Sequence, residues 1–178
     1  SIGEKRVSCR VGAALSGDAV DTCAEFLRRA NLALYQAKRP GAPTLVRFDQ
    51  KMDDEVRRKT QLKEDLRAAL HDGGLYMVYQ PQVHLNGEVV GFEALIRWTH
   101  ESLGSISPSV FIPLAEEAGL IHEIGDFALR RAAHDSRAWN HLKVAVNVSG
   151  LQLQEPAFVE HVLSIVKGEG ADLHDIEI

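Results

Sequence analysis

Two predicted strands carry polar side chains that could bind a cation or a phosphate. Glu93 and Arg97 lie on one face of a predicted strand at 88–98, because side chains alternate along a strand. Asn147 interrupts a second predicted strand, at 143–149. Strands of a parallel sheet usually read as near-continuous apolar runs, and a buried carboxylate usually pairs with a charge or binds a metal ion. These polar residues are therefore candidates for chemistry.

The donor types at Glu93 and Asn147 favour a hard cation. Carboxylate and carboxamide oxygens suit Mg²⁺, Mn²⁺ or Ca²⁺ better than Zn²⁺. The alternative is structural: Glu93 could pair with Arg97 or lie exposed at a strand end. Structural ion pairs are common, so the residues alone leave both interpretations open.

Other catalytic chemistries lack their spacing signatures. The eight histidines include no His-x-x-x-His pair, and neither Cys9 nor Cys23 has a CxxC partner. Ser149-Gly150 lacks the flanking glycines of a nucleophile elbow. The sequence therefore disfavours a zinc site and a Ser or Cys hydrolase. Two cysteines are too few for a disulfide scaffold, and we predict that both are reduced and buried.

Charge and composition narrow the class of protein. The net charge of −5 is divided unevenly, with +4 on residues 1–70 and −9 on residues 71–178. An acidic segment is a poor partner for duplex DNA, whose phosphates require Lys and Arg. It could be a solvated surface, or it could take a phosphate substrate if metal ions supplied positive charge. With no long apolar run and no secretory signal, we expect no membrane contact from this segment. The start at Ser1 and the apolar end at Ile178 predict that both ends are internal to a longer protein.

Apolar periodicity and turn residues predict two unlike segments. In chain order the predicted elements are a strand at 6–15, a turn at 16–18, a helix at 22–38, a strand at 45–48, a helix at 50–71, strands at 75–85 and 88–98, helices at 109–118 and 121–139, a strand at 143–149, a helix at 156–167 and the start of a strand at 175–178. Asn86-Gly87 predicts an antiparallel hairpin. Ser107-Pro108 predicts a helix N-cap and first helical residue. The later alternation of strand and helix predicts a parallel sheet, so the second segment is a hairpin followed by a β/α array.

A family signature stands at residues 91–98. These residues read Gly-Phe-Glu-Ala-Leu-Ile-Arg-Trp and closely resemble the signature of EAL-domain cyclic di-GMP phosphodiesterases. The matches continue in order at Tyr79-Gln80-Pro81, 104–108, 111–121, Val146-Asn147-Val148-Ser149 and Ile176-Glu177-Ile178. Five ordered matches over residues 62–178 make the resemblance specific, whereas a lone Glu-Ala-Leu would indicate nothing.

The resemblance implies a fold, a reaction and a set of site residues. The fold is a modified (β/α)₈ barrel whose first strand is antiparallel, in agreement with the predicted hairpin. Residues 62–178 are about half of the ~250 residues that such a barrel typically needs. The reaction is hydrolysis of cyclic di-GMP to pGpG with Mg²⁺ or Mn²⁺, as two ions in the full domain. The implied metal ligands are Glu93, which is also the implied catalytic residue, Asn147 and Glu177, and the implied dinucleotide contacts are Gln80, Leu95, Arg97 and Pro113.

The resemblance also bears on partners and alternatives. It implies cyclic di-GMP as the ligand, a homodimer through the EAL domain, no DNA and a cytoplasmic location. The alternative is an EAL domain that binds cyclic di-GMP as a receptor without cutting it, or that serves as an interaction module. The intact ligand positions Glu93, Asn147 and Glu177 argue against such decay. Strand parity places Glu177 on the opposite face from Ile176 and Ile178, on a strand expected beside that of Asn147.

The N-terminal segment resembles the last part of a GGDEF domain, the diguanylate cyclase fold. The residues that carry this resemblance are Leu32-Ala33-Leu34-Tyr35-Gln36-Ala37-Lys38, followed by Gly41. The implied division is an α+β GGDEF tail at 1–49, a connecting helix at 50–61 and the first half of an EAL domain at 62–178. Lys38 is the implied contact to the phosphate of GTP. Asn31 replaces a usual Asp and Ala42 replaces a frequent Arg, which puts GTP binding by the upstream domain in doubt.

Overall fold

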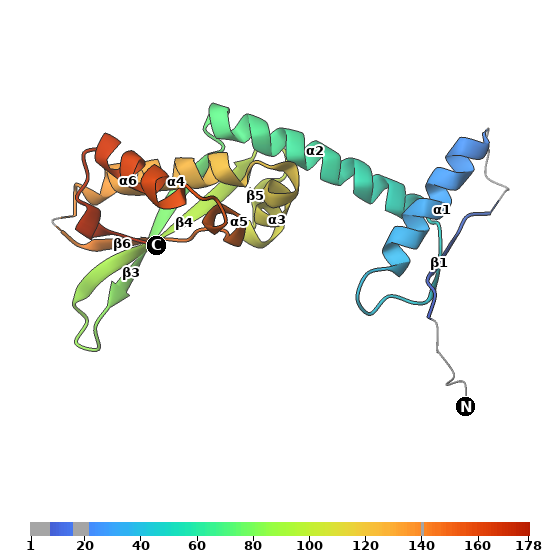
Figure 1. Ribbon diagram of the computed structural model, residues 1–178, viewed down its shortest axis with the longest axis horizontal. Helices are drawn as coiled ribbons and strands as arrows, with labels where there is room; N and C mark the ends of the chain where they lie inside the picture. Colours follow the sequence, from blue (N-terminus) through green and yellow to red (C-terminus); the bar gives the residue numbers. More distant parts are fainter. Residues whose placement is uncertain (1–7, 16–21, 140) are drawn as a thin grey trace. The chain divides into compact units, whose positions relative to one another are not determined.

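A computed structural model describes residues 8–15, 22–139 and 141–178, which form two compact units at Ser1–Thr60 and Gln61–Ile178 (Figure 1). The predicted turn at 16–18 and the first residues of the predicted strand at 6–15 lie outside the described residues. None of the described helices is both long and apolar enough to cross a membrane. The two units are built differently.

The first unit pairs two short strands with one helix. Strand β1 (Val11–Ala13) is parallel to β2 (Leu45–Arg47), and helix α1 (Cys23–Ala37) follows β1 in the chain. The Thr22 side chain accepts a hydrogen bond from the backbone N–H of Glu25 and caps α1. Helix α2 (Gln50–Asp72) begins in this unit. The predicted helices at 22–38 and 50–71 and the predicted strand at 45–48 are confirmed to within about one residue at each end. Of the predicted strand at 6–15, only Val11–Ala13 is a strand among the described residues.

The second unit contains a five-stranded sheet. Its strands are β3 (Leu75–Val83), β4 (Val89–His100), β5 (Gly104–Ile106), β6 (Lys143–Val146) and β7 (Ile176–Glu177), in the order β3-β4-β6-β7 with β5 also paired to β4. Strands β3 and β4 are antiparallel, whereas β4, β6 and β7 are parallel. The turn between β3 and β4 contains Gly87 at a φ of 86°, which a residue with a side chain rarely adopts. The predicted hairpin and the parallel array that follows it are both confirmed.

Helices cover one face of this sheet. They are α3 (Pro108–Ala118), α4 (Ile121–Ser136), the short α5 (Gly150–Leu153) and α6 (Phe158–Gly168), with a 3₁₀ turn η1 (Leu173–Asp175) before β7. Ser107 caps α3 and Pro108 is its first residue, as predicted, and Gly119 ends it at a φ of 70°. Ala94, Val144 and Val146 pack in one apolar cluster with buried residues of α4 and α6. The alternate side chains of β4 and β6, including Glu93, therefore lie on the opposite face.

Two further predictions about local structure are wrong, and three short elements were not predicted. The predicted strand at 143–149 ends at Val146, because Ser149 already caps α5 and the chain turns between them. Strand β5, helix α5 and the turn η1 were not predicted, since each is at most four residues long and shows no period of its own. Cys9 and Cys23 are free thiols but exposed rather than buried, because Cys9 precedes β1 and Cys23 is the first residue of α1.

Candidate functional site

A row of polar side chains crosses four strands of the second unit. Gln80 of β3 is in register with Glu93 of β4, Glu93 with Ala145 of β6, and Ala145 with Glu177 of β7. Residues in register on paired strands project from the same face. The sheet therefore places Gln80, Glu93 and Glu177 in one line, on the face opposite α4 and α6.

Asn147 joins this row by a direct contact. It is the first residue after β6, at the carboxyl end of a parallel strand, and its Nδ2 donates a hydrogen bond of 2.7 Å to Glu93 Oε1. Glu93 is half-buried and Asn147 is exposed. Glu93 and Asn147, which the family resemblance placed at one site, are thus in contact. Asn147 lies just beyond the end of β6 rather than within the strand.

Arg97 does not pair with Glu93. Its Nη1 instead donates a hydrogen bond of 2.9 Å to the carbonyl oxygen of Ile96, and among the described residues no ion pair joins Arg97 to Glu93 within 4.0 Å. The structural alternative for Glu93, an ion pair with Arg97, is therefore not what the structure contains. The partner of the carboxylate is the carboxamide of Asn147.

The donor chemistry of this row fits a hard divalent cation. Asn147 Nδ2 occupies only Oε1 of Glu93, so Glu93 Oε2 and Asn147 Oδ1 have the oxygen chemistry that Mg²⁺ and Mn²⁺ prefer. Glu177 Oε2 lies 3.9 Å from Lys143 Nζ. Across the described ranges, no three His, Cys, Asp or Glu side chains are grouped closely enough to hold a metal ion. A cation here would therefore need the amide ligand Asn147 as well as carboxylates.

A pocket of about 210 Å³ opens next to Asn147, between β4, the end of β6 and helices α3, α4 and α5. Leu95, Arg97 and Asn147 line it together with Glu116 and Ser149. The structure thus gathers three of the predicted site residues around one cavity. Four others of the second unit are outside its lining. Glu93 and Glu177 belong to the row on the opposite face of the sheet, Gln80 is exposed on β3, and Pro113 is exposed within α3.

Lys38 belongs to the other unit. It is exposed and forms the C-cap of α1, where its backbone N–H is within hydrogen-bond distance of the carbonyl oxygens of Leu34 and Tyr35. The structure gives its side chain a place at the surface of the first unit. Its predicted contact to a nucleotide phosphate stays a prediction.

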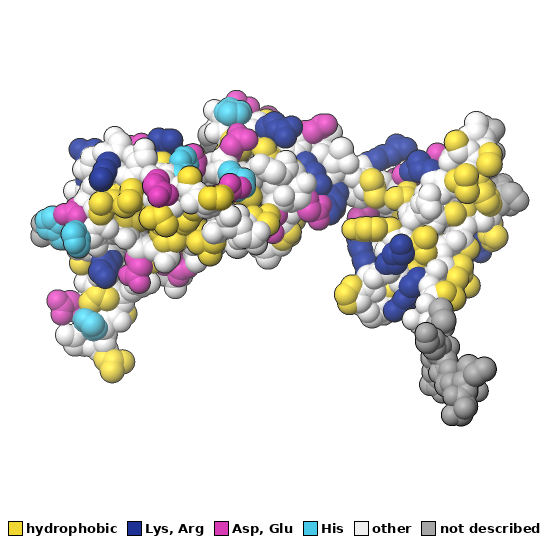
Figure 2. Space-filling model, in the orientation of Figure 1, with side chains coloured by type: hydrophobic (Ala, Val, Ile, Leu, Met, Phe, Trp, Pro, Cys, Tyr) yellow, Lys and Arg dark blue, Asp and Glu magenta, His cyan; other side chains and the backbone are white. Residues whose placement is uncertain are grey.

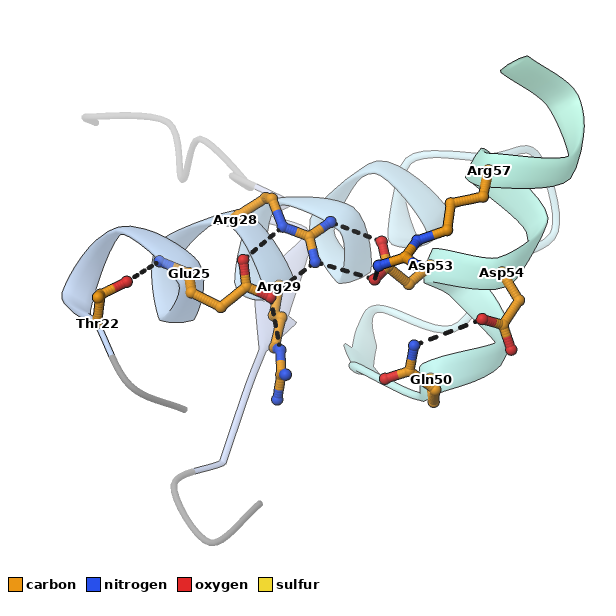
Figure 3. Close-up of polar contacts among 8 residues, drawn as sticks. All are labelled: Thr22, Glu25, Arg28, Arg29, Gln50, Asp53, Asp54 and Arg57. Carbon is orange, nitrogen blue, oxygen red and sulfur yellow. Dashed lines mark hydrogen bonds and ion pairs between the residues drawn. The ribbon is translucent and has the colours of Figure 1, made fainter. Parts of the chain in front are cut away.

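A dense ion-pair cluster in the first unit was not predicted (Figure 3). Arg28 donates two hydrogen bonds to Asp53, from Nη1 to Oδ1 at 2.6 Å and from Nη2 to Oδ2 at 3.0 Å. It also donates to both carboxylate oxygens of Glu25, and Arg29 donates to one of them. The hydrogen bond from Arg28 holds the pKa of Asp53 below its ordinary value, and bonds from Arg28 and Arg29 lower the pKa of Glu25 to about 2. These groups neutralise one another and leave no charge poised for catalysis.

Sequence reasoning also missed three polar residues beside Asn147. They are Glu116, Ser149 and Gln152, which line the same pocket. The Ser149-x-x-Gln152 spacing is a capping-box pattern, and it was the available signal. Glu116 lies inside the family match at 111–121, but nothing in the sequence indicated its contact to Ser149, which joins residues 33 positions apart.

Known proteins resemble this chain along most of its length. An uncharacterized signaling protein of Caulobacter vibrioides is 40% identical over 98% of this chain and 22% of that protein. The bifunctional diguanylate cyclase/cyclic di-GMP phosphodiesterase MucR of Pseudomonas aeruginosa is 38% identical over 89% of this chain and 24% of its own length. The chain therefore spans less than a quarter of the length of each of these two relatives.

A solved structure and a family model agree with these relatives. The structure described as PaMucR phosphodiesterase in a c-di-GMP complex superposes with a TM-score of 0.62 at 38% identity, covering 65% of this chain and 49% of that one. Residues 63–178 match the family model described as the EAL domain. This range contains the antiparallel hairpin of β3 and β4 and the parallel pairing of β4 with β6. The chain belongs to the EAL domain family.

Proposed function

We propose that this chain forms part of the active site of a metal-dependent phosphodiesterase that hydrolyses cyclic di-GMP to linear pGpG. The observation that carries the proposal is the 2.7 Å hydrogen bond between Asn147 and Glu93. It lies where the parallel pairing of β4 with β6 ends, at Ala94 and Val146, and Asn147 follows the carboxyl end of β6. Barrel enzymes gather their catalytic residues at the carboxyl ends of their strands. Support comes from the activities named for the Pseudomonas aeruginosa relatives MucR and NbdA, both cyclic di-GMP phosphodiesterases.

Glu93, Asn147 and Glu177 are the proposed ligands of Mg²⁺ or Mn²⁺, in a family whose phosphodiesterases depend on metal. Two such ions would supply activation of the attacking water and neutralisation of the charge that develops on the phosphate. The protein's own contribution is orientation. Asn147 donates to Oε1 of Glu93 and so limits the rotation of the carboxylate, with Oε2 directed elsewhere. Glu93 is the proposed catalytic residue.

Arg97 is the proposed phosphate contact, and Gln80, Leu95 and Pro113 are the proposed contacts to the rest of the dinucleotide. Arg97 is half-buried and lines the pocket beside Asn147. A guanidinium has five N–H donors, and the bond to the Ile96 carbonyl uses one of them. The remaining donors could hold a phosphate by charge-assisted hydrogen bonds, which are about twice as strong as neutral ones.

Substitution of Glu93 tests the activity. In the full-length protein, Glu93→Gln keeps the shape of the side chain but removes its charge, so we expect turnover of cyclic di-GMP with Mg²⁺ or Mn²⁺ to fall by more than about 100-fold. Conversion to pGpG is measured by liquid chromatography. The matched control is Glu101→Gln, an exposed carboxylate in the turn between β4 and β5, which should leave turnover unchanged.

The outcomes of this test separate a phosphodiesterase, a cyclic di-GMP receptor and an interaction module. Unchanged turnover in Glu93→Gln would show that the site assignment is wrong. If the wild-type protein binds cyclic di-GMP in calorimetry but produces no pGpG with either metal, the protein is a receptor rather than an enzyme. If it neither binds nor cleaves the dinucleotide, an interaction module remains.

Substitution of Arg97 tests the substrate contact. Arg97→Ala should weaken the binding of cyclic di-GMP by about 1.5–3 kcal/mol, the range for a hydrogen bond to a charged group. The melting temperature should stay close to that of the wild type, since Arg97 pairs with no carboxylate among the described residues and its bond reaches only the adjacent residue. A large drop in melting temperature with unchanged affinity would instead assign Arg97 a structural role.

The first unit is proposed to be the tail of a GGDEF domain, with Lys38 near a phosphate of GTP. The proposed division is a tail at 1–49, a connecting helix at 50–61 and an EAL part at 62–178. The name of MucR, which is both a cyclase and a phosphodiesterase, supports this order of domains. The proposal also includes a homodimer through the EAL domain and a cytoplasmic location. The reducing cytoplasm keeps cysteines as free thiols, which is the state of Cys9 and Cys23.

A further inference from the structure

The segment that carries Asn147 is short and would be loose without side-chain support. It links the end of β6 at Val146 to the start of α5 at Gly150. Asn147 is exposed there, and its side chain contacts Glu93 across the strand ends. Because Asn147 is in neither a strand nor a helix, its side-chain rotamer must be restricted by contacts from neighbouring residues.

Ser149 supplies the first support. Its Oγ accepts a hydrogen bond from the backbone N–H of Leu151, and its own backbone N–H donates to Oε1 of Gln152 at 3.0 Å. This is a capping box, in which both backbone donors at the start of a helix are satisfied by side chains. The box fixes the backbone two residues after Asn147.

Glu116 ties this box to a different helix. The hydroxyl of Ser149 donates to Oε1 of Glu116 on α3 at 2.6 Å. A hydroxyl-to-carboxylate bond of this length is a charge-assisted bond and is among the stronger ones in proteins. Both groups are partly buried and line the pocket that Asn147 and Arg97 also line. The loop after β6 is therefore fastened to α3 as well as to α5.

Gly125 of α4 leaves the space that the side chain of Gln152 in α5 occupies. Gln152 is only 4% exposed, and a Cβ built on Gly125 would lie 1.9 Å from its Nε2. Glycine within a helix lowers stability by about 0.5–1 kcal/mol relative to alanine. The close approach of Gln152 explains why a residue without a side chain is needed at this position. The carboxamide can reach the backbone of Ser149 only because α4 lacks a side chain at this point.

From these contacts we propose that Glu116, Ser149 and Gln152, with Gly125 as the seat for Gln152, are positioning residues that hold Asn147 against Glu93. This inference rests on the proposed metal-dependent hydrolysis, because it assigns these residues to the same site. None of them needs to touch substrate or metal. They act through the Asn147 carboxamide, so their loss should reduce metal binding and kcat more than it affects the KM for cyclic di-GMP.

The test compares three variants of the full-length protein. Ser149→Ala removes the hydroxyl, Gly125→Ala displaces Gln152 without deleting any hydrogen-bonding group, and Ser149→Thr keeps the hydroxyl. We expect Ser149→Ala and Gly125→Ala to weaken Mn²⁺ binding, measured by calorimetry with the metal alone, by about tenfold, the lower end of the range for residues that support ligands. Ser149→Thr should bind Mn²⁺ as the wild type does. The kcat should fall with the same pattern, at a KM within about twofold of the wild type.

A matched control removes an equivalent helix cap elsewhere. Thr22→Ala deletes the N-cap of α1 in the first unit, so it lowers local stability in the way that Ser149→Ala does. It should leave Mn²⁺ affinity and kcat unchanged. If Thr22→Ala weakened Mn²⁺ binding as much as Ser149→Ala, the effect would be general destabilisation and the inference would be overturned.

Hydrogen exchange separates this inference from the proposed function. In the wild type the backbone amides of Ser149 and Leu151 are hydrogen-bonded and should exchange slowly. Gly125→Ala should accelerate exchange at Ser149, and this holds whether or not the protein hydrolyses cyclic di-GMP. Unchanged exchange in Gly125→Ala would overturn the inference even in an active enzyme. Absent hydrolysis with accelerated exchange and weakened Mn²⁺ binding would overturn the proposed function alone.

Discussion

The two units of this protein bury different kinds of side chain. Among the described residues of the first unit, those that are buried are Ala33, Ala37 and the carboxylate Asp53. The second unit buries two apolar clusters, one centred on Trp98 and Phe111 and the other between the sheet and helices α4 and α6. Its described buried polar side chains, Ser136, Gln152 and Asp175, are few beside these clusters. Apolar side chains also reach the surface of both units (Figure 2).

This difference shows where charge matters for stability. Apolar burial contributes about 25 cal/mol per Å² whatever the pH, so the apolar clusters of the second unit should be insensitive to moderate acid. Arg28 donates hydrogen bonds to both carboxylate oxygens of Asp53, and these bonds offset the cost of burying its charge. A buried carboxylate without its partner is costly. The first unit should therefore depend on the charge state of a few residues, and the following predictions test that contrast.

The largest effect is expected in the apolar core of the second unit. Phe111 is fully buried, and its ring packs edge-on against Trp98 with centroids 5.8 Å apart. Phe111→Ala should lower the free energy of unfolding by about 3–5 kcal/mol. Both tryptophans of the chain, Trp98 and Trp139, lie in the second unit. Urea unfolding followed by tryptophan fluorescence therefore reports on this unit.

The control is the neighbouring residue on the same helix. Val110 is 48% exposed, so Val110→Ala should cost less than about 1 kcal/mol. Equal losses for the two variants would mean that α3 does not pack as described and that the second unit lacks the apolar core assigned to it.

A smaller loss is expected from the ion-pair cluster of the first unit. Arg28→Met removes the bidentate partner of Asp53 and leaves only Arg57, 3.4 Å away. Because the Arg28 side chain is 42% exposed, the loss should be about 1–2 kcal/mol, below the range for fully buried pairs. Amide exchange along α1 should accelerate by roughly tenfold. Arg58→Met, an exposed residue on α2, is the control and should leave this exchange unchanged.

Acid should act first on the first unit. The pKa of Glu25 is lowered to about 2 and that of Asp53 is lowered by Arg28. A lowered folded-state pKa means that the stabilisation is present above the ordinary carboxyl pKa, about 4, and is lost as the pH falls through the folded value. Nuclear magnetic resonance of α1 amides between pH 6 and about 2 should show loosening that the amides of β6, in the apolar cluster beneath α4 and α6, do not share. The gap between wild type and Arg28→Met should shrink over that interval, and a constant gap would contradict the assignment.

Much of this fold could be predicted from local patterns. The Asn86-Gly87 turn, the Ser107 cap and the helical stripes each fix their elements within a few residues, so the hairpin and the β/α order followed. The strand ending at Val146 could not be predicted, because Asn147-Val148-Ser149 continues the alternation of a strand while Ser149 caps a helix. Parity still placed Glu93 on the correct face.

The site was predictable only in part, because its contacts join distant residues. Alternation along one strand could associate Glu93 with Arg97, but the partner found is Asn147, which is 54 residues away. The bond from Ser149 to Glu116 and the close approach of Gln152 to Gly125 likewise depend on how helices pack. The family resemblance supplied the link between Glu93 and Asn147, which local periodicity could not.

The smallest expected effect concerns a charge-dependent contact within the second unit. His100 Nδ1 accepts hydrogen bonds from the backbone N–H groups of Ser102 and Leu103, at 3.1 and 3.3 Å. Two donors at Nδ1 place the ring hydrogen on Nε2, which lies 2.9 Å from Asp65 Oδ2 and donates to it. The ring therefore bonds both to the turn after β4 and to helix α2.

His100→Asn isolates the second of these bonds. Its Oδ1 can accept near the position of Nδ1, but asparagine is too short to reach Asp65. We expect a loss of about 0.5–1.5 kcal/mol in urea unfolding followed by tryptophan fluorescence, well below that of Phe111→Ala. Glu64→Gln, an exposed neighbour of Asp65, should change nothing. The bond from His100, and then that from Gln61, lowers the pKa of Asp65, so its contribution is present above the ordinary Asp pKa and disappears in acid. The difference between wild type and His100→Asn should therefore narrow as the pH falls below about 4. A difference larger than that of Phe111→Ala would mean that charge, rather than apolar burial, dominates the second unit as well, and the contrast between the units would fail.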